Sequence, residues 1–138
     1  MSIVFWILSA FSFQPALAFS TKIHALLNNE SLANELSGRG KLVSRSIQST
    51  STKALIFVQT TAYTQNDGLP LSLSINVDGK KLSQVSYQSV KRYYYQPISI
   101  NASVVTFEKP GNHRIDFIFG NDTFTDKNCF ISATLIEN

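Results

Sequence analysis

The chain has 138 residues, of which 43% are hydrophobic and 15% charged, and its formal net charge is +3. This length suits one domain that buries a core of its own. The basic residues are spread along the chain and form no arm, which argues against a nucleic-acid-binding protein.

The first 18 residues have the pattern of a secretory signal peptide. They carry no charged side chain, and the apolar run Ile3–Phe13 is followed by the small-x-small triplet Ala16-Leu17-Ala18. Signal peptidase accepts such a triplet, and the run is shorter than the about 20 residues that cross a bilayer. We expect residues 1–18 to be cleaved, leaving a secreted or periplasmic chain without a membrane span. A buried strand or an uncleaved anchor is the alternative, since no Lys or Arg precedes the run.

Residues 19–40 are expected to be an N-terminal arm or spacer. Their apolar residues recur at loosely helical spacing, which predicts a short helix: Ile23, Leu26, Leu27, Leu32 and Leu36. Ser37-Gly38-Arg39-Gly40 would end such a helix.

Residues 41–138 are predicted to form a single all-β domain, an antiparallel β-sandwich like a jelly roll. Turn residues separate about seven segments of strand composition: 41–48, 54–64, 71–77, 80–90, 98–104, 115–119 and 129–136. Because no helical stretches lie between them, a parallel α/β sheet is not expected.

Four segments carry the clearest patterns. The run 54–58 is apolar on both faces, which predicts a central strand packed on each side. Residues 71–77 alternate between apolar and polar side chains before Asp78-Gly79, a pair that favours a hairpin turn. The mixed alternation of 80–90 indicates a bulge or a sheet edge. Cys129, the only cysteine, shares the apolar side of 129–135, so we expect it to be buried; an intermolecular disulfide is the alternative.

Three segments resemble the jelly-roll heads of complement and tumour-necrosis-factor-like proteins, and related β-sandwich modules of bacterial surface proteins and phage tail fibres. They are Ala54–Tyr63, the Ile75–Gly79 strand ending in Asp-Gly, and Lys109–Phe117 before Ala133–Glu137. The resemblance covers roughly residues 53–137 and implies homotrimers with a binding or adhesive role and no shared catalytic site. It departs from the complement pattern because no collagen-like repeat precedes the domain.

Residues that could carry catalysis are scarce. His113 and Asp116 could join a serine in a triad, but three residues along a strand place them on opposite faces and about 10 Å apart. No Gly-x-Ser-x-Gly motif is present. His24, His113 and Cys129 lack the spacing of metal ligands. A small hydrolase is therefore the least favoured alternative.

Calcium is the cofactor to consider, although we do not favour it. Four oxygen-bearing side chains gather in one region: Asn121, Asp122, Asp126 and Asn128. Their spacing does not match an EF-hand loop, and Asp and Asn are also ordinary turn residues.

The most distinctive patch is Lys91-Arg92-Tyr93-Tyr94-Tyr95-Gln96, in which Arg92, Tyr93, Tyr94 and Tyr95 are the candidate binding residues. Three consecutive tyrosines in a strand or loop point to both sides, and Tyr and Arg are enriched in binding surfaces. In the alternative interpretation, Tyr93 and Tyr95 pack in the core while Tyr94 shields a sheet edge. We expect a secreted, non-enzymatic binding or adhesion module that recognises a glycan or protein surface; a structural or assembly subunit is the second hypothesis.

Three sequons begin at Asn29, Asn101 and Asn121. They would be glycan acceptors in a eukaryotic secretory pathway.

Overall fold

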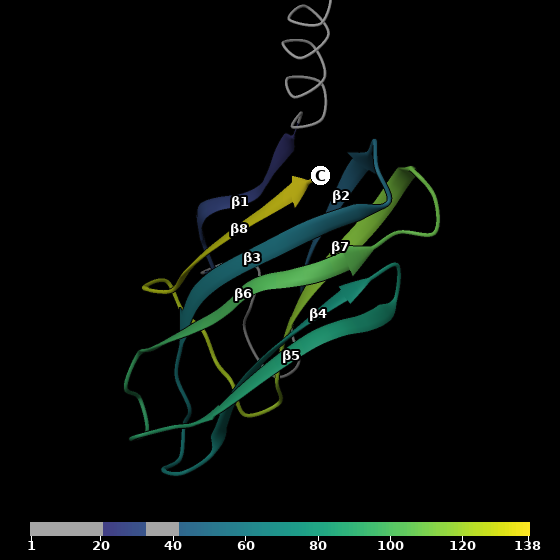
Figure 1. Ribbon diagram of the computed structural model, residues 1–138. Helices are drawn as coiled ribbons and strands as arrows, with labels where there is room; N and C mark the ends of the chain where they lie inside the picture. The colour runs from purple at the N-terminus through teal and green to yellow at the C-terminus, as the bar shows by residue number, and fades with distance from the viewer. Residues whose placement is uncertain (1–20, 33–41) are drawn as a thin grey trace, which may run out of the picture.

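The computed structural model describes residues 21–32 and 42–138, which form a sandwich of two four-stranded antiparallel sheets (Figure 1). The strands are β1 (Lys22–Ser31), β2 (Leu42–Ser49), β3 (Lys53–Ala62), β4 (Pro70–Val77), β5 (Lys80–Gln88), β6 (Gln96–Thr106), β7 (Gly111–Phe119) and β8 (Phe130–Glu137). The all-β prediction is confirmed.

The strand order is that of a jelly roll. One sheet, called sheet A below, has the order β1-β8-β3-β6, and the other, sheet B, has the order β2-β7-β4-β5. Strand 1 therefore pairs with 8, 2 with 7, 3 with 6 and 4 with 5, as in a long antiparallel ribbon rolled up on itself. Residues 21–32 and 42–138 contain eight strands, where the sequence predicts about seven.

The additional strand is β1, which lies in the segment expected to be an arm. It pairs with β8 along the edge of sheet A, so the predicted helix is wrong for residues 22–31. Register shifts between Ala25 and Leu27 and between Leu27 and Glu30 interrupt the pairing. Leu26 and Leu27 are consequently both buried, which a regular strand does not allow. These irregularities explain the helix-like spacing of the apolar residues.

The core lies between the sheets and is built from alternate residues of each strand. Its largest fully buried apolar side chains are Leu32, Ile56, Leu71, Leu73, Ile75, Ile98, Ile115, Phe117, Phe119, Ile131 and Leu135. The alternation predicted for 71–77 and 115–119 is therefore confirmed, and so is the burial of Cys129, which is 0% exposed. Burial leaves no surface for the intermolecular disulfide.

Two expectations about sheet A need correction. Strand β3 is central, between β8 and β6, but only one of its faces is packed: Leu55 is 37% exposed on the other face. In β6 the predicted alternation breaks at Ala102, whose φ of 55° marks a bulge opposite Phe57. Val104 therefore points outward and is 64% exposed.

The hairpin expected at Asp78-Gly79 is present, with positive φ angles of 50° and 83° that suit such a turn. Strand β5 after it lies at the edge of sheet B, and its pairing with β4 contains the expected register shift. No helix within residues 21–32 and 42–138 is long and apolar enough to cross a bilayer.

Candidate functional site

Three loops meet at one end of the sandwich, at the lower left of Figure 1, and bring four aromatic rings together. They connect β3 to β4, β5 to β6, and β7 to β8. We call this end the loop end, and the four rings the aromatic cluster: Tyr63, Tyr93, Tyr95 and Phe124. The rings of Tyr93, Tyr95 and Phe124 lie 5.8, 5.6 and 6.1 Å from that of Tyr63, centroid to centroid. Tyr63 is therefore the centre of the cluster.

Backbone hydrogen bonds hold the three loops in place. Tyr63 and Phe124 form an isolated bridge, with N–H···O distances of 3.0 and 2.8 Å. The Tyr93 amide donates to the Thr64 carbonyl at 2.7 Å, and Tyr93 has a φ of 57°, uncommon for a residue with a side chain. The Arg92 amide donates to Asp67 Oδ1 at 2.8 Å. These main-chain groups thus join the three loops, while Tyr93 and Tyr95 remain exposed and Tyr63 and Phe124 are half-buried.

The predicted tyrosine patch lies on the surface. Tyr93, Tyr94 and Tyr95 are 61%, 58% and 42% exposed, and Arg92 is also exposed. The alternative in which Tyr93 and Tyr95 pack in the core is wrong, because the loop leaves β5 before these residues and never places them between the sheets. Three neighbouring exposed tyrosines present a large amphipathic surface.

Asp126 is the polar centre of the loop end. Its carboxylate accepts hydrogen bonds from the Tyr95 hydroxyl and from the Asn128 amide, the latter at 2.8 Å. Burial would raise the pKa of Asp126, but these hydrogen bonds and one from Cys129 outweigh it and lower the pKa. The hydrogen bond to Asp126 raises the pKa of Tyr95. Tyr95 is therefore a neutral donor whose ring orientation is set by a carboxylate.

The residues considered for calcium lie in this same loop. Asp126 and Asn128 are hydrogen-bonded to each other, whereas Asn121 is exposed and Asp122 half-buried at the start of the loop. Within the described residues, no three histidine, cysteine, aspartate or glutamate side chains come together as metal ligands.

A shallow groove of about 320 Å³ adjoins the cluster on the outer face of sheet A. Its polar lining consists of amides and hydroxyls: Asn29, Gln59, Thr61, Asn128 and Ser132. Pro97 and Phe130 supply the apolar lining, and Phe130 is 42% exposed. Asn128 joins groove and cluster, since its side-chain amide donates to the Tyr95 hydroxyl at 3.4 Å.

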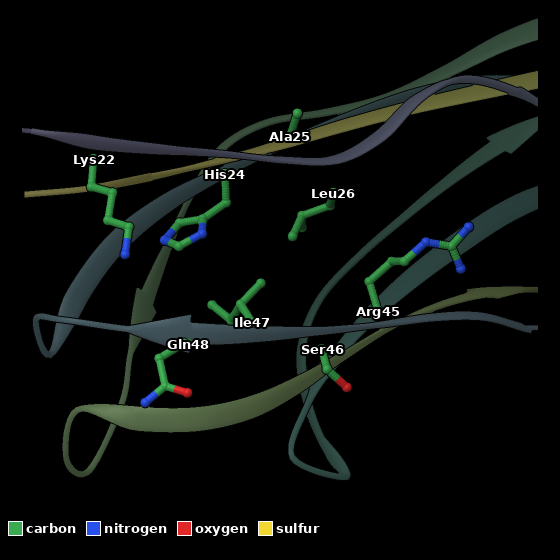
Figure 2. A pocket seen from close by; sticks show the side chains of 8 residues that line it. All are labelled: Lys22, His24, Ala25, Leu26, Arg45, Ser46, Ile47 and Gln48. Atoms are coloured by element: carbon green, nitrogen blue, oxygen red, sulfur yellow. The ribbon is translucent and has the colours of Figure 1, made fainter.

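A second hollow, of about 430 Å³, lies between the edge strands β1 and β2 (Figure 2). His24, Lys22 and Leu26 point into it from β1, and Ile47 and Arg45 face them from β2. Arg45 is bound to Glu30 at 2.5 Å. This hollow therefore offers cationic side chains, of which Arg45 already has a carboxylate partner.

His24 belongs to a buried network and not to a mobile arm. Its Nε2 lies 2.6 Å from Glu137, a carboxylate that is 1% exposed and that also accepts the amides of Thr50 and Ser51 at 2.7 and 2.9 Å. Burial would raise the pKa of Glu137, but hydrogen bonds from His24 and the two amides lower it to about 2. The arrangement stabilises a buried carboxylate.

The imagined His113–Asp116 pair does not form. Asp116 binds Ser44 Oγ at 2.5 Å and Arg114 at 3.0 Å. His113 stacks on Phe107 at 4.2 Å, with Nδ1 2.6 Å from Asp78 and Nε2 2.8 Å from the Lys109 carbonyl. Both ring nitrogens therefore have partners other than a nucleophile.

The three sequon asparagines, Asn29, Asn101 and Asn121, are all exposed. Asn29 and Asn101 lie on sheet A, and Asn121 lies in the loop after β7.

Sequence reasoning found the tyrosine patch but missed its supporting residues. Tyr63 ends a strand segment and Phe124 lies in a turn-rich stretch, so neither stands out in the sequence. The sequence indicates Asn128 only as a candidate calcium ligand and not as a residue that contacts Tyr95. The sequence does not predict the groove, because the apolar run 54–58 indicates a strand that is packed on both faces and so has no exposed outer surface.

No protein-family model matches the chain, and no curated protein matches it in sequence. Among solved structures, a carbohydrate-binding module CBM36 in complex with calcium and xylotriose matches with a TM-score of 0.50 at 13% identity, covering 84% of this chain and 98% of that one. The insecticidal delta-endotoxin Cry8Ea1 from Bacillus thuringiensis matches with a TM-score of 0.53 at 11% identity, covering 83% of this chain and 24% of that one. These similarities show the shared sandwich fold and nothing finer. They do not show the resemblance to complement and tumour-necrosis-factor-like heads.

Proposed function

We propose that the protein is an exported, non-catalytic carbohydrate-binding module whose ligand binds at the loop end. One observation carries this proposal: three tyrosines remain 42–61% exposed on loops held by main-chain hydrogen bonds, beside a groove lined with amides and hydroxyls. Export rests on the signal-peptide pattern of residues 1–18.

The chemistry of the surface suits a sugar. A pyranose has apolar C–H faces and a rim of hydroxyl groups. Aromatic rings cover the faces, and amide side chains donate to and accept from the hydroxyls. Tyr93 and Tyr94 supply rings, while Gln59 and Asn128 supply amides within the adjoining groove. Binding costs little side-chain conformational entropy at Tyr95, because its hydrogen bond to Asp126 already orients the ring.

The fold supports the proposal at a coarser level. The matched CBM36 structure holds xylotriose on the same type of sandwich, although 13% identity transfers no residue role to this chain. The support is therefore for a binding module as a class, and the position of the ligand rests on the tyrosines.

The proposal is tested with Tyr94→Ala. Tyr94 is 58% exposed and outside the aromatic cluster, so the variant keeps the fold. Tyr87→Ala is the matched control, since Tyr87 is 40% exposed on β5 and takes no part in the cluster. Affinity electrophoresis through gels containing xylan, glucomannan, mixed-linkage β-glucan or amylose measures binding.

We expect the wild type and Tyr87→Ala to be retarded by at least one of these polysaccharides, and Tyr94→Ala to be retarded far less. Loss of one stacking ring raises Kd about tenfold. Retardation of the Tyr94→Ala protein equal to wild type would remove the tyrosine patch from the site.

A different observation favours the second hypothesis, an assembly subunit. One row across all four strands of sheet A is aliphatic on the outer face: Ile23, Ile136, Leu55 and Val104. Ile23 and Val104 are 67% and 64% exposed. A second copy of the chain would cover this row, and face-to-face packing of sheets is a common arrangement. Light scattering after gel filtration tests it: a stable oligomer dispersed by Val104→Lys supports assembly, and a wild-type monomer contradicts it.

A further inference from the structure

The groove beside the aromatic cluster continues along the outer face of sheet A. Next to the 320 Å³ hollow that adjoins the aromatic cluster lies another of about 260 Å³, lined by Phe57, Asn101 and Thr134. Gln59 and Ser132 line both hollows. The two hollows are therefore one continuous surface, which follows β3 with β8 on one side and β6 on the other.

Cross-strand pairing explains why these side chains lie in rows. Gln59 is opposite Ser132 of β8 and Ser99 of β6, and all three are uncharged hydrogen-bonding residues. Phe57 is opposite Thr134 on one side and the β6 bulge on the other, and this bulge places Asn101 at the groove. Along the outer face of β3, the hydrogen-bonding side chains of Thr61 and Gln59 are therefore followed by the apolar ring of Phe57, with Asn101 and Thr134 beside it.

The groove carries no charge. None of the side chains that line its two hollows belongs to Asp, Glu, Lys or Arg, although the chain contains 12 basic and 9 acidic residues. An acidic polysaccharide would find no cation there. Cationic side chains line other hollows, one between β1 and β2 (Figure 2) and one beside the β4–β5 hairpin, where Lys80, Lys81 and Lys109 lie. The groove accordingly matches an uncharged ligand.

The polar surface ends at the aliphatic row defined above. Leu55, Ile136 and Val104 follow the Phe57 row and line a separate hollow that is largely apolar. Sugar hydroxyls would find no side-chain partner on these three residues, so the hydrogen-bonding part of the surface runs from Asn128 to Phe57. Thr61 to Phe57 alone spans about 13 Å at the usual rise of a strand.

From this geometry we infer that the ligand is an uncharged, extended polysaccharide, whose chain lies along β3 from the aromatic cluster to Phe57 and Asn101. The inference rests on the proposed function and adds to it the charge class of the glycan and the direction of its chain. The groove is shallow and open along the sheet, so the site takes internal stretches of the chain and not only its end.

The test measures how affinity depends on chain length. Isothermal titration uses di-, tri-, tetra- and hexasaccharides of whichever neutral polysaccharide retards the wild type, with polygalacturonate as the acidic comparator. Gln59→Ala combined with Asn101→Ala removes two of the four amide side chains that line the groove, the two nearest its Phe57 end; both are exposed, so the fold is kept. Gln48→Ala is the control, an exposed glutamine on β2 of the other sheet. Tyr94→Ala reports separately on the loop end.

We expect the wild type and Gln48→Ala to bind the hexasaccharide at least tenfold more tightly than the disaccharide. The double groove variant should lose most of this gain, since each neutral hydrogen bond contributes about fivefold in affinity. It should bind the disaccharide as the wild type does, and polygalacturonate should not compete.

The failures are distinguishable. If the double groove variant keeps the full gain with chain length while Tyr94→Ala loses binding, the loop end binds a glycan but the groove inference is wrong. Tighter binding of polygalacturonate than of the neutral polysaccharide also overturns the inference. If no neutral polysaccharide binds, both the proposed function and the inference fall.

Discussion

The two ends of the sandwich are built from different chemistry. At the loop end, exposed tyrosine rings lie on the surface, and the carboxylate of Asp126 accepts a hydrogen bond from the hydroxyl of one of them, Tyr95. The opposite end, at the upper right of Figure 1, carries the short turns and the last residues of β8. There His24 binds Glu137, and His113 binds Asp78, both at 2.6 Å. We call it the polar end.

This difference separates stability from recognition. The ionisable side chains of the polar end pair with each other, so their hydrogen bonds are used within the fold. The rings of the loop end still expose much of their surface, which is costly unless something binds it. Substitutions at the polar end should therefore change the free energy of unfolding, and those at the exposed tyrosines should change binding.

The largest effect is expected for Glu137→Ala. It leaves the part-buried amides of Thr50 and Ser51 without their acceptor and His24 without its carboxylate partner. The pKa of Glu137 falls from its ordinary 4.5 to about 2, which corresponds to about 3 kcal/mol of stability near neutral pH. Because the folded pKa is the lower one, this contribution is present above pH 4.5 and lost as the pH falls towards 2. Urea unfolding over that range measures it.

Glu108→Ala is the control for this prediction, since Glu108 is exposed in the loop before β7. It should change the free energy of unfolding by less than about 0.5 kcal/mol. A Glu137→Ala protein as stable as this control would show that the buried carboxylate contributes nothing.

The next largest effect concerns Tyr63, the centre of the aromatic cluster. Tyr63→Ala removes three ring contacts and should lower the free energy of unfolding by about 2 kcal/mol. Tyr94→Ala, outside the cluster, should lower it by less than about 0.5 kcal/mol. Chemical denaturation of the two variants compares them directly, and equal losses would mean that both rings are structural.

A smaller, pH-dependent effect is expected at His113. Its two ring nitrogens both face acceptors, so both must carry protons to donate. Burial would lower the pKa of His113, but the hydrogen bond to Asp78 and the one to the Lys109 carbonyl raise it above 6.5. Stability from this pair is complete below pH 6.5 and lost as the pH rises through the folded value. His113→Gln should cost about 1 kcal/mol below pH 6.5 and less at alkaline pH; a constant difference in thermal unfolding would contradict this.

The smallest effect is a titration shift at the loop end. Asp126→Asn removes the carboxylate that raises the pKa of Tyr95, so that pKa should move down towards 10.0. Ultraviolet difference titration of the tyrosines measures the change. An unaltered titration curve would show that Asp126 does not orient the Tyr95 ring.

Strand alternation and turn chemistry predicted most of the fold. Leu71, Leu73 and Ile75 alternate without interruption, and Asp78-Gly79 forms the expected turn. In β1 and β6, irregular strand pairing makes the prediction from apolar–polar alternation wrong. The register shifts of β1 bury the adjacent Leu26 and Leu27 and mimic helical spacing, and the bulge at Ala102 turns Val104 outward.

Only the sequence-local part of the candidate site could be predicted. Tyr93, Tyr94 and Tyr95 are consecutive, so their patch is visible in the chain. The ring that Tyr93 and Tyr95 contact, Tyr63, comes from a loop about thirty residues earlier, and its position depends on the bridge to Phe124. The polar end is even harder to predict from the sequence, since His24 and Glu137 are 113 residues apart and meet only through β1–β8 pairing. Pairing over such distances leaves no mark in local composition.

The most direct test of the binding surface is a backbone-amide NMR titration of the wild type with a neutral hexasaccharide from the binding panel. We expect shift changes at residues 92–95, at Asn128 and Phe130, and along β3 at residues 57–61, with none at His113, Asp78 or Glu137. Shift changes confined to the polar end or to the hollow between β1 and β2 would contradict it.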